Sequence, residues 1–208
     1  MNKMVEKETQ KKNKVYIEIM TYGHAKWEKT IEFAENCSWK AGAFLAEKMK
    51  ANQFEDNERV LIAIANGEPV AFCVFSNYDE LSLEYEFTPF IGFMFVDENY
   101  RGHRLSGKLI DAACNIARSQ GFSKIYIMSG EIGLYEKYGF LKLGDYRTIY
   151  DSVEQLFAKK IRQGAFWKER LGRRGFLLVR RRNGDKNRGL PSQPRALRLD
   201  CDRRRAFL

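Results

Sequence analysis

The sequence predicts an α/β fold in which helices cover both faces of a mixed sheet of about six or seven strands. Two apolar, β-rich runs, residues 59–65 and 69–75, are joined by Asn66-Gly67. Both turn residues tolerate the positive φ of a type I′ turn, so the runs should form an antiparallel hairpin. A strand–helix–strand pattern over residues 90–128 should place two parallel strands side by side. Antiparallel and parallel pairs in one chain predict a mixed sheet.

One strand and two helices are predicted before the hairpin. Residues 15–20 (VYIEIM) alternate loosely between apolar and polar side chains, which predicts a first strand. Apolar residues then recur near the helical spacing around 27–34 and 43–49. Pro69 should lie at the start or edge of its strand, because proline has no N–H to donate to a ladder.

The strand–helix–strand unit carries the most regular pattern. Residues 90–96 (FIGFMFV) are continuously apolar, as expected for a strand that is buried on both faces. A polar turn follows, and apolar residues then repeat at helical spacing from Leu105 to Ala117. Gly121 stands where a C′ glycine should end that helix. Residues 124–128 (KIYIM) predict the second buried strand.

The remaining elements are shorter. Residues 133–138 (GLYEKY) predict a short helix closed by Gly139, and residues 140–143 begin another strand. Residues 152–161 (SVEQLFAKKI) are ambiguous, because they combine a capping-box pattern with helical spacing and yet suit a strand equally well.

Composition excludes several classes of protein. The 208-residue chain has no apolar run that approaches 18 residues, so no membrane span is predicted. The charged N-terminus does not resemble a secretory signal. Four well-separated cysteines and two histidines argue against zinc sites and disulfide scaffolds, so we expect a reduced, cytoplasmic protein without a metal.

The net charge of +9 is unevenly placed. Residues 1–150 hold 19 Lys and Arg against 21 Asp and Glu, whereas residues 151–208 hold 17 against 6. The usage of basic residues also changes, from 5 Arg and 16 Lys before position 161 to 13 Arg and 2 Lys after it. The basic character therefore belongs to the C-terminal quarter and not to the predicted folded body.

The turn before the central helix is a candidate phosphate site. A helix that begins near Leu105 leaves backbone N–H groups unpaired and carries a partial positive charge there. Gly102 and Gly107 allow a ligand to approach the backbone, and Arg101 and Arg104 add cationic donors. On these residues alone, an ordinary βα turn is equally compatible.

Read whole, the segment PFIGFMFVDENYRGHRLSGKLIDAAC followed by GFSKIYIMSGEIGLYEKYGFLKLGDY resembles the acetyl-CoA-binding half of GNAT N-acetyltransferases. FVDENYRG resembles the strand and turn that lead into that family's pyrophosphate loop, and GLYEKYGF resembles its short helix near the reacting thioester. The resemblance implies a GNAT-like, splayed sheet over residues 14–161, acetyl-CoA as the cofactor, and N-acetyltransferase activity.

The resemblance also implies which residues contact the coenzyme. The pantetheine arm would enter the gap between strands 90–96 and 124–128 and pair with backbone groups of Phe95 and Val96. Where the family pattern reads Gln/Arg-x-x-Gly-x-Gly/Ala, this chain has Arg104 at the first Gly place and Ser106 at the small-residue place. The amide donors survive any side-chain change except proline. The implied pyrophosphate-binding residues are Arg101, Gly102, His103, Arg104, Leu105, Ser106 and Gly107.

The implied mechanism is direct transfer of the acetyl group to a primary amine of a small molecule or peptide. Tyr135 matches the general-acid tyrosine that protonates the leaving thiolate. Packing of the short helix onto the sheet is its alternative role, and it is the expected role of Tyr138. Cys73 raises the possibility of an acyl-enzyme, although a buried, inert cysteine is the expectation inside an apolar strand.

Four carboxylates, Asp79, Glu80, Glu84 and Glu86, crowd the loop predicted over residues 77–86. One of them could act as the base or bind a cationic acceptor, and Asp79 and Glu80 are the candidate acceptor-binding residues.

A solvated acidic loop is the alternative interpretation of these carboxylates. Trp39 is a further candidate for the acceptor pocket, with packing between the first two helices as its alternative, and Glu131 is a weaker candidate base.

Three segments follow from these patterns. Residues 1–13 are expected to be a flexible lead, 14–161 the catalytic domain, and 162–208 an Arg-rich tail that is disordered or foreign. A non-catalytic acyl-CoA-binding sensor and a nucleic-acid-binding protein that acts through the tail remain the alternatives to an enzyme. A homodimer is possible, and no membrane partner is expected.

Overall fold

The computed structural model describes residues 15–82 and 84–162. Its elements are β1 (Tyr16–Met20), α1 (Trp27–Asn36), α2 (Ala41–Lys50), β2 (Arg59–Ala65), β3 (Glu68–Ser76), β4 (Phe90–Val96), η1 (Glu98–Tyr100), α3 (Leu105–Ser119), β5 (Lys124–Ser129), η2 (Tyr135–Tyr138), β6 (Leu141–Arg147) and β7 (Val153–Lys160). The flexible lead expected over residues 1–13 lies outside the described residues. The tail expected over 162–208 also lies outside them, apart from Arg162. In the described part of the chain, no helix is both long and apolar enough to cross a bilayer.

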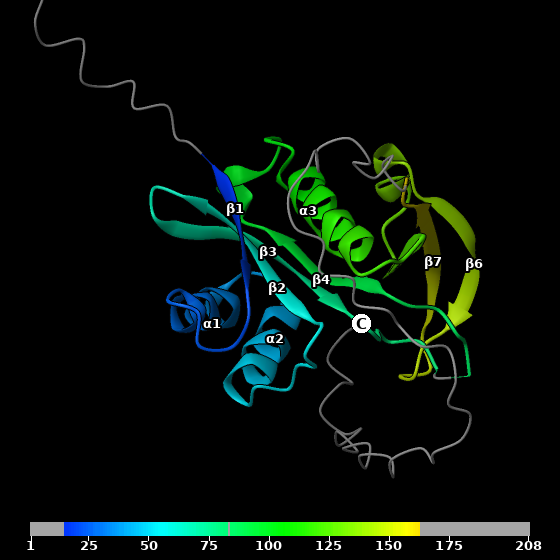
Figure 1. Ribbon diagram of the computed structural model, residues 1–208, viewed down its shortest axis with the longest axis horizontal. Coiled ribbons are helices and arrows are strands. Elements are labelled where there is room, and N and C mark those ends of the chain that lie inside the picture. The colour runs from blue at the N-terminus through cyan, green and yellow to red at the C-terminus, as the bar shows by residue number, and fades with distance from the viewer. Residues whose placement is uncertain (1–14, 83, 163–208) are drawn as a thin grey trace, which may run out of the picture. The chain divides into compact units, whose positions relative to one another are not determined.

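Seven strands form one mixed sheet in the order β1-β2-β3-β4-β5-β7-β6 (Figure 1). The β4–β5 pair is parallel and the five other neighbouring pairs are antiparallel. The predicted fold class, the strand–helix–strand unit and the parallel pair are therefore confirmed.

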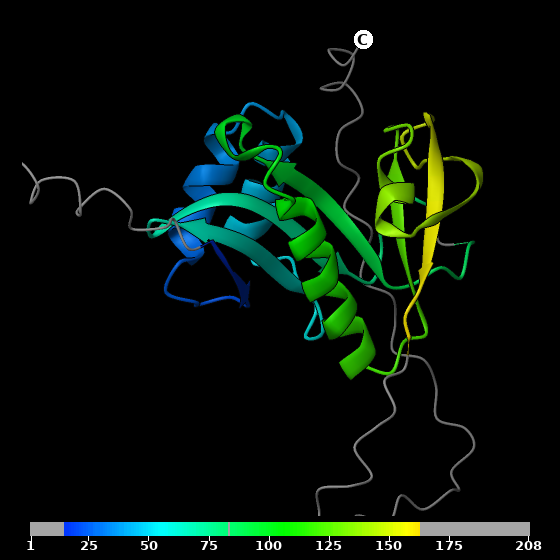
Figure 2. The ribbon, with the colours of Figure 1, turned by 90° about the horizontal axis from the view of Figure 1, so that it is seen from above.

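The sheet opens between its two parallel strands. β4 and β5 pair only at Phe90 and Tyr126, where the Tyr126 N–H donates to the Pro89 carbonyl at 2.9 Å. Beyond this point the strands diverge, as Figure 2 shows, while α3 connects them across one face. The predicted splay is confirmed, and among the described strands none pairs with this edge of β4 along most of its length.

The hairpin turn has the predicted geometry. Asn66 and Gly67 both have positive φ, 54° and 86°, as a type I′ turn requires. Pro69 is the second residue of β3 and lies at a register shift opposite Ile64, so it removes no regular ladder bond.

Two apolar clusters cover the two faces of the sheet. α1 and α2 bury Trp27, Ile31 and Met49 against one face, together with Phe72 and Phe95 from the strands.

α3 buries Leu109, Ile110 and Ala113 against the opposite face, where Cys73 and Ile125 belong to the same cluster. Helices therefore cover both faces, as predicted (Figure 1).

Residues 153–160 form β7. The alternative helix was wrong because this segment pairs with β5 on one side and with β6 on the other. Such non-local pairing satisfies its backbone groups, and its apolar spacing cannot reveal that pairing. The short helix before it is a 3₁₀ turn, Tyr135–Tyr138, closed by Gly139 at a φ of 81°.

Candidate active site

The junction between β4 and α3 presents an uncapped helix start. Arg104 occupies the N-cap position in the left-handed conformation, and no side chain caps the helix. The first-turn N–H groups, those of Leu105, Ser106 and Gly107, have no acceptor inside the helix. Gly102 has a φ of 82°, and in the described part of the chain no atom other than those of the adjoining residues lies within 4 Å of the place that a Cβ would occupy there. This open, positively polarised turn fits the diphosphate of a coenzyme.

Arg104 adopts a left-handed backbone conformation that usually favours glycine. Its φ of 57° and ψ of 31° lie in the left-handed region, where a residue with a Cβ loses about 1–2 kcal/mol relative to the right-handed form. The side chain is exposed. The substitution at the family's glycine place therefore preserves the backbone donors at a conformational cost.

Arg101 holds the turn that precedes this loop. Its Nε donates to the Val96 carbonyl at 3.2 Å, and its Nη2 pairs with Glu98 Oε1 at 2.7 Å. Glu98 also accepts a hydrogen bond from the Ser38 hydroxyl, so the α1–α2 connection is tied to the same turn. The predicted donor side chain is thus already engaged with β4 and η1, whereas His103 is exposed beside it.

The free edge of β4 presents Val96. The Asp97 N–H donates to the Val70 carbonyl on β3 at 3.0 Å, and Val96 and Phe95 lie opposite Ala71 and Phe72. In an antiparallel ladder the direction of the backbone groups alternates from residue to residue. The N–H and the carbonyl of Val96 therefore face the opening, where the carbonyl already accepts from Arg101 Nε. The groups of Phe95 face β3, which departs from the pairing predicted for Phe95.

A β-bulge interrupts β4 halfway along the opening. The register shifts between Phe72 and Val74, and Phe93 has a φ of 50°, in the left-handed region. Such bulges redirect backbone and side chains and occur often beside functional sites. The sequence analysis missed this bulge, although Gly92 within an otherwise apolar strand was a usable signal.

A pocket of about 150 Å³ lies at this opening. It brings together four residues that were predicted separately as site residues, Trp39, Asp79, Glu80 and Tyr135. The sequence analysis missed Glu154 on β7, whose segment was ambiguous. The lining residues are Trp39, Ala41, Asp79, Glu80, Ile91, Gly92, Phe93, Met94, Met128, Tyr135 and Glu154.

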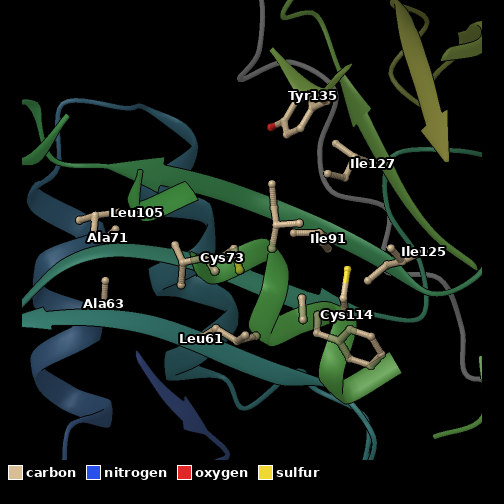
Figure 3. Close-up of a cluster of buried hydrophobic side chains, with 14 of the residues drawn as sticks. Leu61, Ala63, Ala71, Cys73, Ile91, Leu105, Cys114, Ile125, Ile127 and Tyr135 are labelled. Carbon is tan, nitrogen blue, oxygen red and sulfur yellow. The ribbon is translucent and has the colours of Figure 1, made fainter. Parts of the chain in front are cut away.

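Tyr135 is fixed on the β5 side of the opening. Its ring packs against Phe140 and Phe157 at centroid distances of 6.0 and 5.7 Å, and only 5% of the residue is exposed. Burial raises the pKa of Tyr135 to about 12, although a hydrogen bond with Ser129 partly offsets it. The phenol therefore stays protonated at neutral pH. Figure 3 shows Tyr135 and, from β4, Ile91 on opposite sides of the opening.

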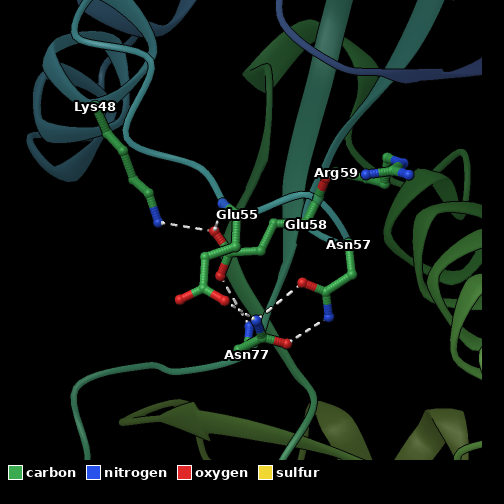
Figure 4. Close-up of polar contacts among 6 residues, drawn as sticks. All are labelled: Lys48, Glu55, Asn57, Glu58, Arg59 and Asn77. Carbon is green, nitrogen blue, oxygen red and sulfur yellow. Dashed lines mark hydrogen bonds and ion pairs between the residues drawn. The ribbon is translucent and has the colours of Figure 1, made fainter. Parts of the chain in front are cut away.

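Asp79 lies on the loop between β3 and β4, and both ends of its segment are anchored. At one end, the Asn77 N–H donates to the buried Glu58 carboxylate at 2.9 Å, and Asn77 exchanges amide hydrogen bonds with Asn57 (Figure 4). At the other end, the Ile149 N–H donates to the Glu80 carbonyl at 2.8 Å. The carboxylate position is therefore set by the fold and not by a free loop.

Aromatic side chains form the opposite wall. Trp39 stacks on Phe95 with a centroid distance of 6.4 Å and an interplanar angle of 2°, and it meets Phe93 edge to face at the same distance. Trp39 is 38% exposed, so part of its ring remains open toward the pocket. Trp39 therefore packs against β4, whereas the predicted alternative was packing between the first two helices, and it also borders the pocket.

The other candidates lie elsewhere. Cys73 is fully buried, and burial raises the pKa of its thiol, which disfavours a thiolate nucleophile. Glu84, Glu86 and Glu131 are exposed and do not line the pocket. Tyr138 packs against the α3 cluster, and a Cβ on Gly107 would lie 3.0 Å from its ring. Among residues 15–82 and 84–162, no three His, Cys, Asp or Glu side chains gather as a metal site requires.

The splayed sheet and the start of α3 match the features that the resemblance to GNAT acetyltransferases implies. The acetyltransferase (GNAT) family profile matches residues 23–140. No curated protein sequence matches the chain significantly.

Solved structures share the fold at low sequence identity. A putative GNAT acetyltransferase from Desulfovibrio desulfuricans has a TM-score of 0.55 at 10% identity, with 71% of this chain and 99% of that chain covered. A GNAT acetyltransferase from Streptococcus pneumoniae has a TM-score of 0.53 at 15% identity, with coverages of 71% and 99%. An aminoglycoside 6′-N-acetyltransferase in complex with coenzyme A has a TM-score of 0.52 at 14% identity, with coverages of 69% and 97%.

The family profile spans more than half of the chain, and the chain therefore belongs to the GNAT acetyltransferase family. Membership makes it an acyltransferase, and acetyl-CoA is the typical cosubstrate of that family.

Proposed function

We propose that this protein is an N-acetyltransferase that moves the acetyl group of acetyl-CoA directly to a primary amine. The observation that carries the proposal is the pocket at the β4–β5 opening, where Tyr135, two loop carboxylates and Trp39 line one space beside the free edge of β4. A direct transfer needs the acceptor and the thioester in one space at the same time.

The donor side relies on backbone groups. The α3 first turn and the left-handed residues before it would hold the diphosphate, and the Val96 backbone would meet the pantetheine arm along the free edge of β4. Bound acetyl-CoA supplies the activated thioester carbonyl. The chain orients it and supplies hydrogen-bond donors for the charge that develops on the carbonyl oxygen.

The acceptor side relies on side chains. Asp79, Glu80 and Glu154 place negative charge in the pocket, and the Trp39 ring offers a face to a cation. This combination favours a protonated amine over a neutral or anionic acceptor. Aminoglycosides, which are acetylated by one protein of similar fold, belong to this chemical class, and polyamines and peptide N-termini are also members.

Tyr135 would act as the general acid. Its hydroxyl keeps its proton through the neutral range and lines the pocket from the β5 side. From there it would donate to the departing sulfur. Because the phenol keeps its proton until the thiolate forms, that proton is available when the sulfur leaves.

The proposal is tested by measuring coenzyme A release from acetyl-CoA across a panel of alkylamines, diamines, aminoglycosides and short peptides, with mass spectrometry of the products. For at least one cationic amine, we expect coenzyme A and the N-acetylated product to form in equal amounts. Calorimetry with coenzyme A runs in parallel. Binding without turnover would favour the acyl-CoA sensor, and folded protein that binds no coenzyme A would contradict both.

Glu80→Gln sharpens the acceptor assignment. Removing this charge should raise the acceptor KM several-fold and leave the acetyl-CoA KM unchanged, because the residue borders the pocket and not the α3 turn. Glu136→Gln, an exposed carboxylate on η2 outside the pocket lining, is the matched control. An unchanged acceptor KM in Glu80→Gln would remove Glu80 from the site.

A further inference from the structure

Direct transfer to an amine requires a base. A primary amine resembles a lysine side chain, whose pKa lies near 10.4, so at neutral pH nearly all of the acceptor is an ammonium ion without a free electron pair. The β4 residues that line the pocket, Ile91, Gly92, Phe93 and Met94, have no titratable side chain. The base therefore has to come from another element or from solvent.

We propose that Asp79 is the general base that takes the proton from the acceptor ammonium, an assignment that rests on the proposed N-acetyltransferase function. One Asp79 oxygen, Oδ1, accepts the Glu80 N–H at 2.9 Å, which fixes the carboxylate. The other, Oδ2, lies over β4, because a Cβ built on Gly92 would be 3.3 Å from it. Gly92 directly precedes the bulge residue Phe93, so Oδ2 lies where β4 opens.

Gly92 has a specific consequence in this arrangement. Any side chain at that position would contact the Asp79 carboxylate at a distance tighter than most Cβ contacts. A glycine therefore lets the carboxylate rest against the β4 backbone within the pocket. The same glycine and aspartate both line the pocket that Tyr135 lines.

The groups that face Asp79 adjust its basicity. Burial, together with the negative charges of Glu80 on the same loop and Glu154 on β7, raises the pKa of Asp79 to about 7. The Glu80 N–H and the Lys48 ammonium on α2 act in the opposite direction. Tyr135 on η2 is protonated and adds no charge at neutral pH. A base performs best when its pKa lies near the working pH, which matches this environment.

Asp79 is preferred over the other carboxylates for a geometric reason. Its Oδ2 lies over β4 at Gly92, and Asp79 lines the same pocket as Tyr135. Glu131 acts on Tyr135 but does not line the pocket. Glu80 and Glu154 line the pocket, and each acts on Asp79 by raising its pKa. We assign these two to binding the cationic acceptor.

The complete step balances as follows. Asp79 removes one proton from R–NH₃⁺, which leaves an electron pair on the nitrogen. That pair forms the N–C bond with the acetyl carbon, and the electrons of the C–S bond leave with the sulfur. Tyr135 gives its proton to the sulfur and regains one from the nitrogen of the new amide. Asp79 then releases its proton to solvent, so the products are the N-acetylated amine, the free thiol of coenzyme A and one proton.

The test is the pH dependence of kcat/KM for the acceptor in the full-length protein. With Asp79 as the base, the wild type should rise through pH 7 and then level off up to the pKa of the amine. Asp79→Asn should lose about 100-fold at pH 7 and should instead rise about tenfold per pH unit toward the pKa of the amine, because only the free amine then reacts. Glu84→Gln, an exposed carboxylate on the same loop, should follow the wild type.

A weakly basic amine separates a chemical role from a structural one. An acceptor that is already neutral at pH 7 needs no base, so the gap between wild type and Asp79→Asn should shrink at least tenfold with it. Glu154→Gln should lower the pH of the rise without removing it, because it removes a charge that raises the pKa of Asp79.

Three results would overturn the assignment. They are a wild-type profile with no inflection near pH 7, an Asp79→Asn profile that keeps the inflection, and loss of the inflection in Glu154→Gln. Thermal unfolding shows whether Asp79→Asn folds. If it does not, the wild-type pH profile still tests the assignment. Failure of the wild type to acetylate any amine would contradict the proposed function itself, and the assignment of Asp79 with it.

Discussion

The two ends of the β4 opening differ in what they are made of. At the α3 end, residues 101–107 form the turn that we propose binds the coenzyme, called the coenzyme turn below. It presents backbone N–H groups, and the side chains of Arg101, His103 and Arg104 are exposed. At the other end, the pocket presents side chains with specific chemistry, namely Tyr135 and Asp79, both with pKa values shifted by burial. The function proposed for the α3 end depends on the backbone conformation, and the function proposed for the pocket end depends on the identity of the side chains.

This difference predicts that the departure at Arg104 is tolerated. A donor built from backbone N–H groups survives a side-chain change as long as the residue can adopt the left-handed conformation. A proton donor or acceptor has no such freedom, because its function resides in one atom. Substitutions should therefore affect the two ends in different kinetic parameters, and the following predictions test this separation.

The largest effect is expected at the pocket end. Tyr135→Phe removes only the hydroxyl and keeps the packing against Phe140 and Phe157. We expect kcat to fall about 100-fold while the Kd for coenzyme A, measured by calorimetry, stays within twofold. Tyr138→Phe is the matched control and should keep kcat. A parallel loss of coenzyme affinity in Tyr135→Phe would show that the two ends are not separable.

The next effect is expected at the coenzyme turn. Ser106→Pro removes one backbone donor in the first turn of α3, where the helix itself does not use it. We expect the affinity for coenzyme A to fall at least tenfold, since a hydrogen bond to a charged group contributes roughly 1.5–3 kcal/mol. Ser106→Ala keeps the donor and should bind within about twofold of the wild type. Equal losses in both variants would assign the contact to the hydroxyl instead.

The smallest effect concerns stability. Arg104→Gly removes the conformational cost of a Cβ at a φ of 57°. This gain is partly offset because glycine is more flexible in the unfolded chain. We expect the free energy of unfolding to rise by about 0.5–1 kcal/mol, measured by denaturant titration, with coenzyme affinity unchanged. Arg101→Gly is the contrasting variant, because it removes the bonds to Val96 and Glu98 and should destabilise the protein. Lower stability in Arg104→Gly would mean that its side chain holds the turn.

Local signals in the sequence predicted most of the fold. Asn66-Gly67 predicted its turn because the required positive φ is a property of those two residues themselves. Gly121, with a φ of 88°, likewise ended α3 where expected. Residues 153–160 were ambiguous because their spacing suits a helix, and only β5 and β6, distant in sequence, make them a strand.

The site was predictable as a set of residues but not as a pocket. Tyr135 and the α3 turn were found through a motif, and Asp79 and Glu80 through their clustering in one loop. The splay of the sheet, the bulge at Phe93 and the position of Asp79 over Gly92 depend on contacts between separate elements. No pattern within one segment encodes those contacts. Only the structure therefore shows that Asp79 and Tyr135 line the same pocket.

The backbone link between the loop of Asp79 and Glu80 and the β6–β7 turn affects more than local stability. Leu81 bridges to Thr148, and the Glu80 carbonyl accepts the Ile149 N–H. A turn some 70 residues downstream thereby governs where two pocket carboxylates stand. Under the proposed function, insertions or deletions in that turn would offer evolution a way to exchange one amine for another, while coenzyme recognition at the start of α3 is left intact.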